Sequence, residues 1–287
     1  MNDDNRWHIL TRKKFELQIV DAFKYFRQHR IEPILIKGWA AARLYPPGVH
    51  RPFVDIDLAV SSADYASARR LLQSKDGSGL NIDLHRELRH LDTKAWNEVY
   101  KDSHLIFLDG AAIRIPSPED HLRILCVHWL NDGGVDKERL WDIFYAVQNR
   151  PEEFDWDRCL RTVSEIRQRW IISTIGLAHK YLHLEIDHLP FAERAKKLPT
   201  WLISAIENEW KSGIRLTSLH ICFNDWRALS AQIRKRIPPN PVQATIEMEG
   251  SFESRSRLYY QLGTMFIRAV PSIKRIYGMI ARKRDTN

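Results

Sequence analysis

The stretch FVDIDLAV, residues 53–60, constrains the fold more than any other part of the chain. Its β-branched and large apolar residues predict a buried strand. Because successive side chains of a strand point to opposite faces, Val54 and the two alternate apolar residues after it should face the core. Asp55 and Asp57 then share the other face. Two neighbouring carboxylates repel each other, and neither ionises cheaply unless a cation lies between them.

A later segment, Leu80–His85, repeats this pattern and predicts another strand. Asp83 and His85 should share one of its faces, and Asp83 would join the Asp55–Asp57 pair if the two strands lie side by side. Carboxylate oxygens are the ligands of hard cations such as Mg²⁺, and three carboxylates can hold two ions. A DxD pair alone also occurs by chance at the solvated edge of a sheet. The residues around it therefore decide whether a metal site is the better interpretation.

The residues before the DxD pair have the features of a phosphate site. A predicted strand ends in Lys37-Gly38 and runs directly into a short helix over Trp39–Tyr45. The backbone N–H groups and positive end of a helix start attract anions. Gly38 permits close approach of the backbone, Lys37 adds a positive charge, and Arg51 could reach the same anion. The order of strand, KG, helix, Arg and DxD strand therefore predicts phosphates beside carboxylates.

Secondary-structure signals change character near Pro116. Before it, helices are expected over 12–30, 39–45 and 64–73, strands over 34–37, 53–60 and 80–85, and a hairpin over 105–108 and 112–115. After it, helices are expected over 118–131, 136–149, 155–168, 170–184, 199–211, 216–236 and 252–283, with a polar connection over 238–249. We therefore predict an α+β fold, in which a small mixed-sheet core (residues 1–116) precedes an all-helical C-terminal domain (residues 117–287).

Composition sets the broad class of protein. The 287 residues, 44% hydrophobic and 28% charged, can bury a sizeable core. No apolar run is long enough to span a bilayer and the N-terminus lacks a signal pattern, so we expect a cytoplasmic protein. Three scattered cysteines, Cys126, Cys159 and Cys222, are typical of reduced core thiols. The net charge of +8 permits an anionic partner such as a nucleotide or RNA without requiring one.

These motifs resemble the nucleotidyltransferase superfamily with the DNA polymerase beta-like fold. More narrowly, they resemble the uncharacterised bacterial nucleotidyltransferase family, in which an apolar strand, KG, a helix ending in LY, an Arg and DIDL follow one another. The corresponding residues here are LIKG at 35–38, LY at 44–45, Arg51, DIDL at 55–58, DLH at 83–85, PSPED at 116–120, His128 and LWDI at 140–143. The resemblance covers about residues 30–148.

The resemblance implies a catalytic trio and its metal ions. Asp55, Asp57 and Asp83 would hold two Mg²⁺ ions, and Asp83 would also help to activate an acceptor hydroxyl. An NMP group would pass from an NTP such as ATP to that hydroxyl, with release of pyrophosphate. His85 either orients Asp83 or contacts the acceptor; a polar strand residue facing solvent is the alternative interpretation.

The resemblance also implies a nucleotide-binding turn. Lys37, Gly38, Trp39 and Arg51 occupy the matching positions. The wider superfamily usually has Ser after the glycine, where this chain has Trp39. No side-chain hydroxyl is available there, so backbone amides, Lys37 and Arg51 would have to bind the triphosphate.

Other candidate residues have plainer interpretations. His179 and His183 lie one helical turn apart, but no Glu follows the first His as in a zinc protease, so a solvated pair is favoured. His128 and Asp142 suggest structural or supporting roles. The basic residues of the C-terminal tail predict a solvated face, or else a phosphate-rich partner; they are Lys274, Arg275, Arg282, Lys283 and Arg284.

Three functions remain open from the sequence. The first is a nucleotidyltransferase whose helical domain binds a small molecule, peptide or protein acceptor. The second is an RNA-directed nucleotidyltransferase, favoured only by the positive charge. The third is a non-catalytic nucleotide-binding regulatory protein of the same fold, which the intact Asp55, Asp57 and Asp83 argue against.

Overall fold

The computed structural model describes residues 3–88, 94–214, 216–217, 219–222 and 225–268. In chain order its elements are α1 (Asp3–Gln28), β1 (Ile34–Leu35), α2 (Trp39–Ala42), β2 (Ile56–Val60), α3 (Ser62–Gln73), β3 (Ile82–Arg86), α4 (Trp96–Asp102), β4 (His104–Leu108), β5 (Ala111–Ile115), α5 (Pro118–Asn131), α6 (Leu140–Gln148), α7 (Trp156–Arg161), α8 (Glu165–Leu182), α9 (Ala192–Lys196), α10 (Thr200–Ser212), η1 (Leu219–Cys222), α11 (Trp226–Arg236) and α12 (Pro241–Glu247). Residues 258–268 are also helical.

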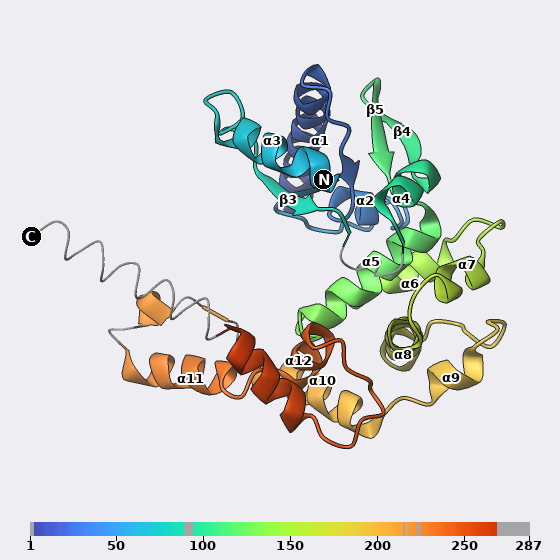
Figure 1. Cartoon of the computed structure of the whole chain (residues 1–287), viewed down its shortest axis with the longest axis vertical. Coiled ribbons are helices and arrows are strands. Elements are labelled where there is room, and N and C mark those ends of the chain that lie inside the picture. Colours follow the sequence, from blue (N-terminus) through green and yellow to red (C-terminus); the bar gives the residue numbers. More distant parts are fainter. Residues whose placement is uncertain (1–2, 89–93, 215, 218, 223–224, 269–287) are drawn as a thin grey trace, which may run out of the picture.

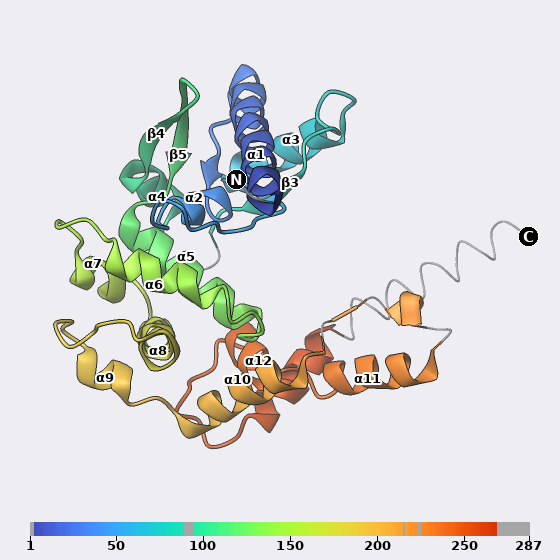
Figure 2. The same ribbon diagram turned by 180° about the vertical axis from the view of Figure 1, so that it is seen from behind.

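The strands and the later helices occupy different parts of the molecule. The sheet elements and α1 to α4 gather at one end, and α5 leads from them to the remaining helices (Figure 1; Figure 2 from behind). In the described part of the chain every strand precedes α5. The α+β prediction is therefore confirmed.

Strand β2 is the central strand of a three-stranded sheet. It pairs antiparallel with β1 and parallel with β3, in the order β1-β2-β3. The parallel connection runs through α3, whose first turn is capped by the Ser61 hydroxyl accepting the Asp64 backbone N–H. This pairing sets Asp57 directly opposite Asp83. A second sheet is the predicted hairpin of β4 and β5.

Both faces of β2 are covered, and all five of its residues are buried. Leu58 and its alternate neighbours belong to one core, shared with Phe23 of α1. Ala59, on the opposite face, packs in another core with Ile124 of α5. Because side chains alternate along a strand, Asp57 shares the face of Ala59. The aspartate therefore points towards the space between the sheet and α5.

The expectation for Val54 is wrong. Its side chain is 71% exposed, and β2 begins only at Ile56. The partner strand β1 is two residues long, and the last backbone bond on that side joins the Ile36 N–H to the Asp57 carbonyl. In the described part of the chain no strand pairing continues on that side beyond this bond, so the residues before Ile56 lie outside the sheet.

Several helix boundaries also differ from the predictions. Residues 238–249, expected to form a polar connection, contain α12, whose start is capped by the Asn240 side chain with Pro241 in the first turn. The Ser164 cap starts α8 at Glu165, earlier than the expected residue 170. The helix predicted over 155–168 is therefore shortened to α7. Within the predicted helix over 216–236, the described residues form the short 3-10 helix η1 and, after the Asp225 cap, α11. Of the predicted helix over 252–283, residues 258–268 are helical, and residues 269–283 lie outside the described residues.

The predicted core thiols are confirmed: Cys126, Cys159 and Cys222 are free and buried. A search of the described helices for a stretch with the length and apolarity of a membrane span found none.

Substitutions on either side of Ile56 test the observed start of β2. Leu58→Ala should lower the free energy of unfolding by about 2–5 kcal/mol, because it opens a cavity in a closed core. Val54→Ala should change it by less than about 0.5 kcal/mol, because that side chain is already in water. Urea unfolding followed by circular dichroism measures both. Equal losses in the two variants would contradict the observed start of the strand.

Candidate active site

Asp57, Asp83 and His85 meet where β2 and β3 run side by side. The His85 Nε2 lies 3.0 Å from Asp57 Oδ1 and 3.2 Å from Asp83 Oδ2. One ligand atom from each of the three residues lies within 4.8 Å of the others. Within the described ranges this is the one group of three or more such side chains that could hold a metal ion. The predicted alignment of the two strands therefore brings Asp57 and Asp83 together.

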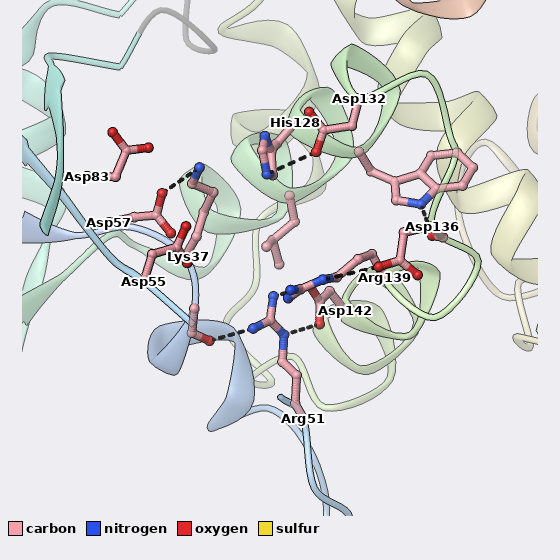
Figure 3. Close-up of a pocket in the computed structure, with 13 residues that line it drawn as sticks. Lys37, Arg51, Asp55, Asp57, Asp83, His128, Asp132, Asp136, Arg139 and Asp142 are labelled. Atoms are coloured by element: carbon pink, nitrogen blue, oxygen red, sulfur yellow. Dashed lines mark hydrogen bonds and ion pairs between the residues drawn. The ribbon is translucent and has the colours of Figure 1, made fainter. Parts of the chain in front are cut away.

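Asp55 joins this group from the segment just before β2. Its side chain lines the same cavity as Asp57 and Asp83, and Figure 3 shows the three carboxylates on one side of it. Burial raises the pKa of the Asp55 carboxyl, and the negative charges of Asp57 and Asp83 raise it further. This repulsion is the cost that a bound cation would relieve. The donor set of carboxylate oxygens and one imidazole nitrogen fits a divalent cation.

Lys37 forms a buried ion pair at the centre of the site. Its Nζ lies 2.7 Å from Asp57 Oδ1, and both side chains are buried. Burial alone would raise the pKa of Asp57. The hydrogen bond from His85 and the charge of Lys37 outweigh burial and hold this pKa at about 2. Asp57 is therefore ionised at any physiological pH.

Gly38 is required by the turn that carries Lys37. Its φ of 53° lies in the region that favours glycine, and an added Cβ would lie 3.2 Å from the Asp55 carbonyl oxygen. The Trp39 side chain turns away from the cavity into the core, where its Nε1 donates to Glu16 at 3.0 Å. Only the backbone of Trp39 is available for the predicted nucleotide contact.

Arg51 connects the turn to the helical part of the molecule. It donates from Nε and Nη2 to the two Asp142 carboxylate oxygens at 2.5 and 2.6 Å, and from Nη1 to the Gly38 carbonyl at 3.1 Å. Tyr45 donates to the same carboxylate at 2.7 Å. Asp142 is buried near the start of α6. Arg51, which was predicted to bind phosphate, is thus held in place by Asp142. The sequence analysis did not predict this pair.

A cavity of about 360 Å³ lies between the sheet, α5 and α6 (Figure 3). Its lining residues are Lys37, Gly38, Arg51, Asp55, Asp57, Asp83, Leu125, His128, Trp129, Asp132, Asp136, Arg139 and Asp142. Six aspartates thus face three lysine or arginine side chains. Burial, with a contribution from the charge of Lys37, lowers the pKa of His128 to about 4, so this residue is neutral at pH 7. The lining carries a formal excess of negative charge.

The loop between α5 and α6 supplies residues that the sequence analysis missed. Asp132, Asp136 and Arg139 line the cavity from this segment, which turns through two glycines with positive φ, Gly133 and Gly134. The run NDGGVDKER has the composition of a turn. Nothing in its spacing shows that it returns to the DxD strand, because that approach depends on how α5 packs on the sheet.

The remaining candidates lie away from the site. The ring Nδ1 of His179 lies 2.7 Å from the Leu184 carbonyl oxygen, and His183 ends α8 in the left-handed conformation. Neither belongs to a metal-binding group among the residues described. The basic tail from Lys274 to Arg284 lies outside the described residues.

Aligned aspartates beside a lysine-glycine turn on a small α+β core form the arrangement that the resemblance to nucleotidyltransferases implies. The model of the family described as "Uncharacterised nucleotidyltransferase" matches residues 4–183, well over half of the chain. The protein therefore belongs to this family and is an enzyme that transfers a nucleotidyl group. The match extends the expected resemblance from residues 30–148 to the end of α8. Searches of curated proteins and of solved structures found no match.

The ion pair of Lys37 can be tested by its effect on acid stability. Lys37→Met should cost about 3–5 kcal/mol at pH 7, because it leaves the buried Asp57 charge without its partner. The folded pKa of Asp57 lies below its ordinary value of 3.8, so the pair stabilises the fold above that pH. The stability gap between the parent and the variant should therefore narrow as the pH falls from about 4 to about 2.

The matched control is Lys13→Met. Lys13 Nζ also lies 2.7 Å from a carboxylate, that of Asp109, but this pair is exposed. Its removal should leave the urea unfolding midpoint nearly unchanged at every pH. The account of the buried pair is wrong if both variants lose the same stability.

Proposed function

We propose that the protein transfers NMP from a nucleoside triphosphate to a hydroxyl group of a small molecule, peptide or protein, with Mg²⁺ as cofactor. The observation that supports this most is the excess of aspartates around a cavity beside a lysine-glycine turn. A triphosphate that entered the cavity without cations would be repelled by the negative charge of these aspartates. Divalent cations that enter with the triphosphate would neutralise both partners.

In this proposal Asp55, Asp57 and Asp83 hold two Mg²⁺ ions. When bound, such ions neutralise phosphate charge and lower the pKa of a hydroxyl. Lys37 keeps Asp57 ionised and in place, and His85 orients Asp57 and Asp83 through its contacts with both. The Asp57 and Asp83 carboxylates are thus oriented before substrate binds.

The reaction would be an in-line displacement. The acceptor oxygen forms a bond to the α-phosphorus, the bond to the β-phosphate oxygen breaks, and pyrophosphate leaves. Asp83 takes the hydroxyl proton, for which its exposed carboxylate is suited. In this proposal the phosphates bind beside Gly38 and the Arg51 guanidinium, which line the cavity, and the backbone of Trp39, the next residue after Gly38, contacts them.

The acceptor would bind to the helical domain, which we place at residues 117–287 after a catalytic domain at 1–116. A neighbouring cavity of about 630 Å³ supports this assignment, because it shares Asp132 and Asp136 with the catalytic cavity. Trp210 and Ile214 give it apolar surface. The aspartates at its junction favour a small molecule or peptide over an RNA phosphate backbone. The free buried cysteines support a cytoplasmic location.

Asp55→Asn tests the catalytic role with little disturbance of the fold. Among the residues that the structure describes, no lysine pairs with Asp55 as Lys37 pairs with Asp57, so the substitution does not leave a buried charge unpaired. We expect nucleotidyl transfer to fall by about 100-fold or more, because a ligand of the metal ions is lost. Incubation with labelled NTPs and a cell extract, followed by mass spectrometry of nucleotidyl adducts, measures the change.

Asp109→Asn, an exposed carboxylate on the hairpin, is the control and should transfer at the parental rate. Thermal unfolding of each variant checks that the fold is kept. Parental transfer by Asp55→Asn would place the active site elsewhere.

A further inference from the structure

A third cavity, of about 290 Å³, opens beside the catalytic one and has a different character. The two share Arg51, Asp136 and Arg139 in their linings. Whereas carboxylates dominate the first, the third is lined by the aromatic rings of Tyr45, Trp141 and Tyr145. A ligand with charged and aromatic parts could therefore bind across both.

The aromatic residues of this cavity form one group of contacting rings, in which Trp141 stacks on Tyr145 and Tyr45 is tilted by 50° against Tyr145. The rings of Trp141 and Tyr145 are 5.6 Å apart and 26° from parallel, and those of Tyr45 and Tyr145 are 4.5 Å apart. Trp141 and Tyr145 lie four residues apart on α6 and so share a face of that helix. All three rings are only partly buried. Their arrangement leaves aromatic surface at the wall of a cavity.

The group is fixed relative to the phosphate turn. Buried Asp142 accepts hydrogen bonds from Tyr45 and Arg51, and Arg51 in turn donates to the Gly38 carbonyl. One carboxylate thus positions an aromatic wall of the third cavity and a basic wall of the first. A site preorganised in this way loses little entropy when its ligand binds.

We propose that the third cavity binds the nucleobase of the nucleoside triphosphate, stacked on the Trp141 and Tyr145 side of the cavity. This inference rests on the proposed function, which places the triphosphate in the catalytic cavity. The aromatic cavity is too small for a whole nucleotide with its ions, but it suits the flat apolar base. Stacking acts on the π-face that every base has, so it provides affinity with little selection among bases.

The larger cavity of about 630 Å³ is the competing position for the base. It contains one aromatic side chain, Trp210, among charged groups that include the ion pair of Lys235 with Glu209. It reaches the catalytic cavity through Asp132 and Asp136 and shares no basic residue with it. Because Arg51 lines both the catalytic and the aromatic cavity, the base of a nucleotide whose triphosphate lies near Arg51 is closer to the aromatic cavity.

Calorimetry with two ligands separates base from phosphate recognition. The parent and its variants are titrated, with Mg²⁺ present, with the non-hydrolysable α,β-methylene ATP and with inorganic tripolyphosphate. Trp141→Leu keeps apolar volume but removes the π-face. It should weaken the affinity for the nucleotide analogue about tenfold, while tripolyphosphate binds as to the parent. Trp141→Phe should restore most of the loss, and Trp210→Leu should leave both affinities unchanged.

The outcomes distinguish the inference from the function on which it rests. If the parent binds neither ligand, the proposed function fails and the inference fails with it. If the parent binds both but Trp141→Leu changes both affinities equally, or neither, the inference alone is overturned. A selective loss of nucleotide affinity in Trp210→Leu would move the base to the larger cavity and also overturn it. Should Trp141→Leu not fold, the parent still decides: equal affinity for the two ligands excludes base recognition.

Discussion

The buried ion pair between Lys37 and Asp57 is the interaction on which the site depends. It joins the end of the β1 segment to the central strand, and it keeps a carboxylate ionised where burial alone would favour its neutral form. A buried ion pair of this kind is a weak source of stability, since the cost of desolvation offsets most of the attraction. Its consequence here is positional: one oxygen of Asp57 contacts Lys37 and His85, beside Asp83 on the neighbouring strand.

A second buried ion pair, between Arg51 and Asp142, holds the segment before β2 against the helical part of the molecule. Asp142 lies on α6, beyond the sheet in sequence, and Arg51 lies just before the DxD strand. Through the contact of Arg51 with the Gly38 carbonyl, the helical part is tied to the turn beside the carboxylates. The aspartate-lined cavity therefore lies between elements of both parts, and two further cavities share lining residues with it. This arrangement gives the triphosphate, the base and the acceptor separate places in the proposed function.

The parts of the site that follow from local rules could be predicted from the sequence. Strand alternation predicted the direction of Asp57 on β2, and the repeated pattern at Asp83 and His85 predicted a strand that brings Asp83 to it when the two lie side by side. Asp55 lines the same cavity but lies before β2, where strand alternation does not apply. Strand alternation wrongly predicted that Val54 is buried, because its exposure depends on the shortness of the partner strand β1. The contact of Arg51 with Asp142 and the contributions of Asp132 and Asp136 also escaped prediction, because they depend on how α5 and α6 pack on the sheet; Arg51 and Asp142 are 91 positions apart in the sequence. The α12 helix differs in that its start has a local signal, the Asn240 cap followed by Pro241. The polar composition of residues 238–249 nevertheless favoured a connection.

The central claim is that the aspartates of β2 and β3 bind divalent cations together with a triphosphate. A crystal structure of the protein with Mn²⁺ and a non-hydrolysable nucleoside triphosphate, recorded at the manganese absorption edge, tests it most directly. The account predicts anomalous peaks in bonding contact with the Asp57 and Asp83 carboxylates and with phosphate oxygens. A nucleotide bound without a cation at these residues, or manganese bound elsewhere, would contradict it.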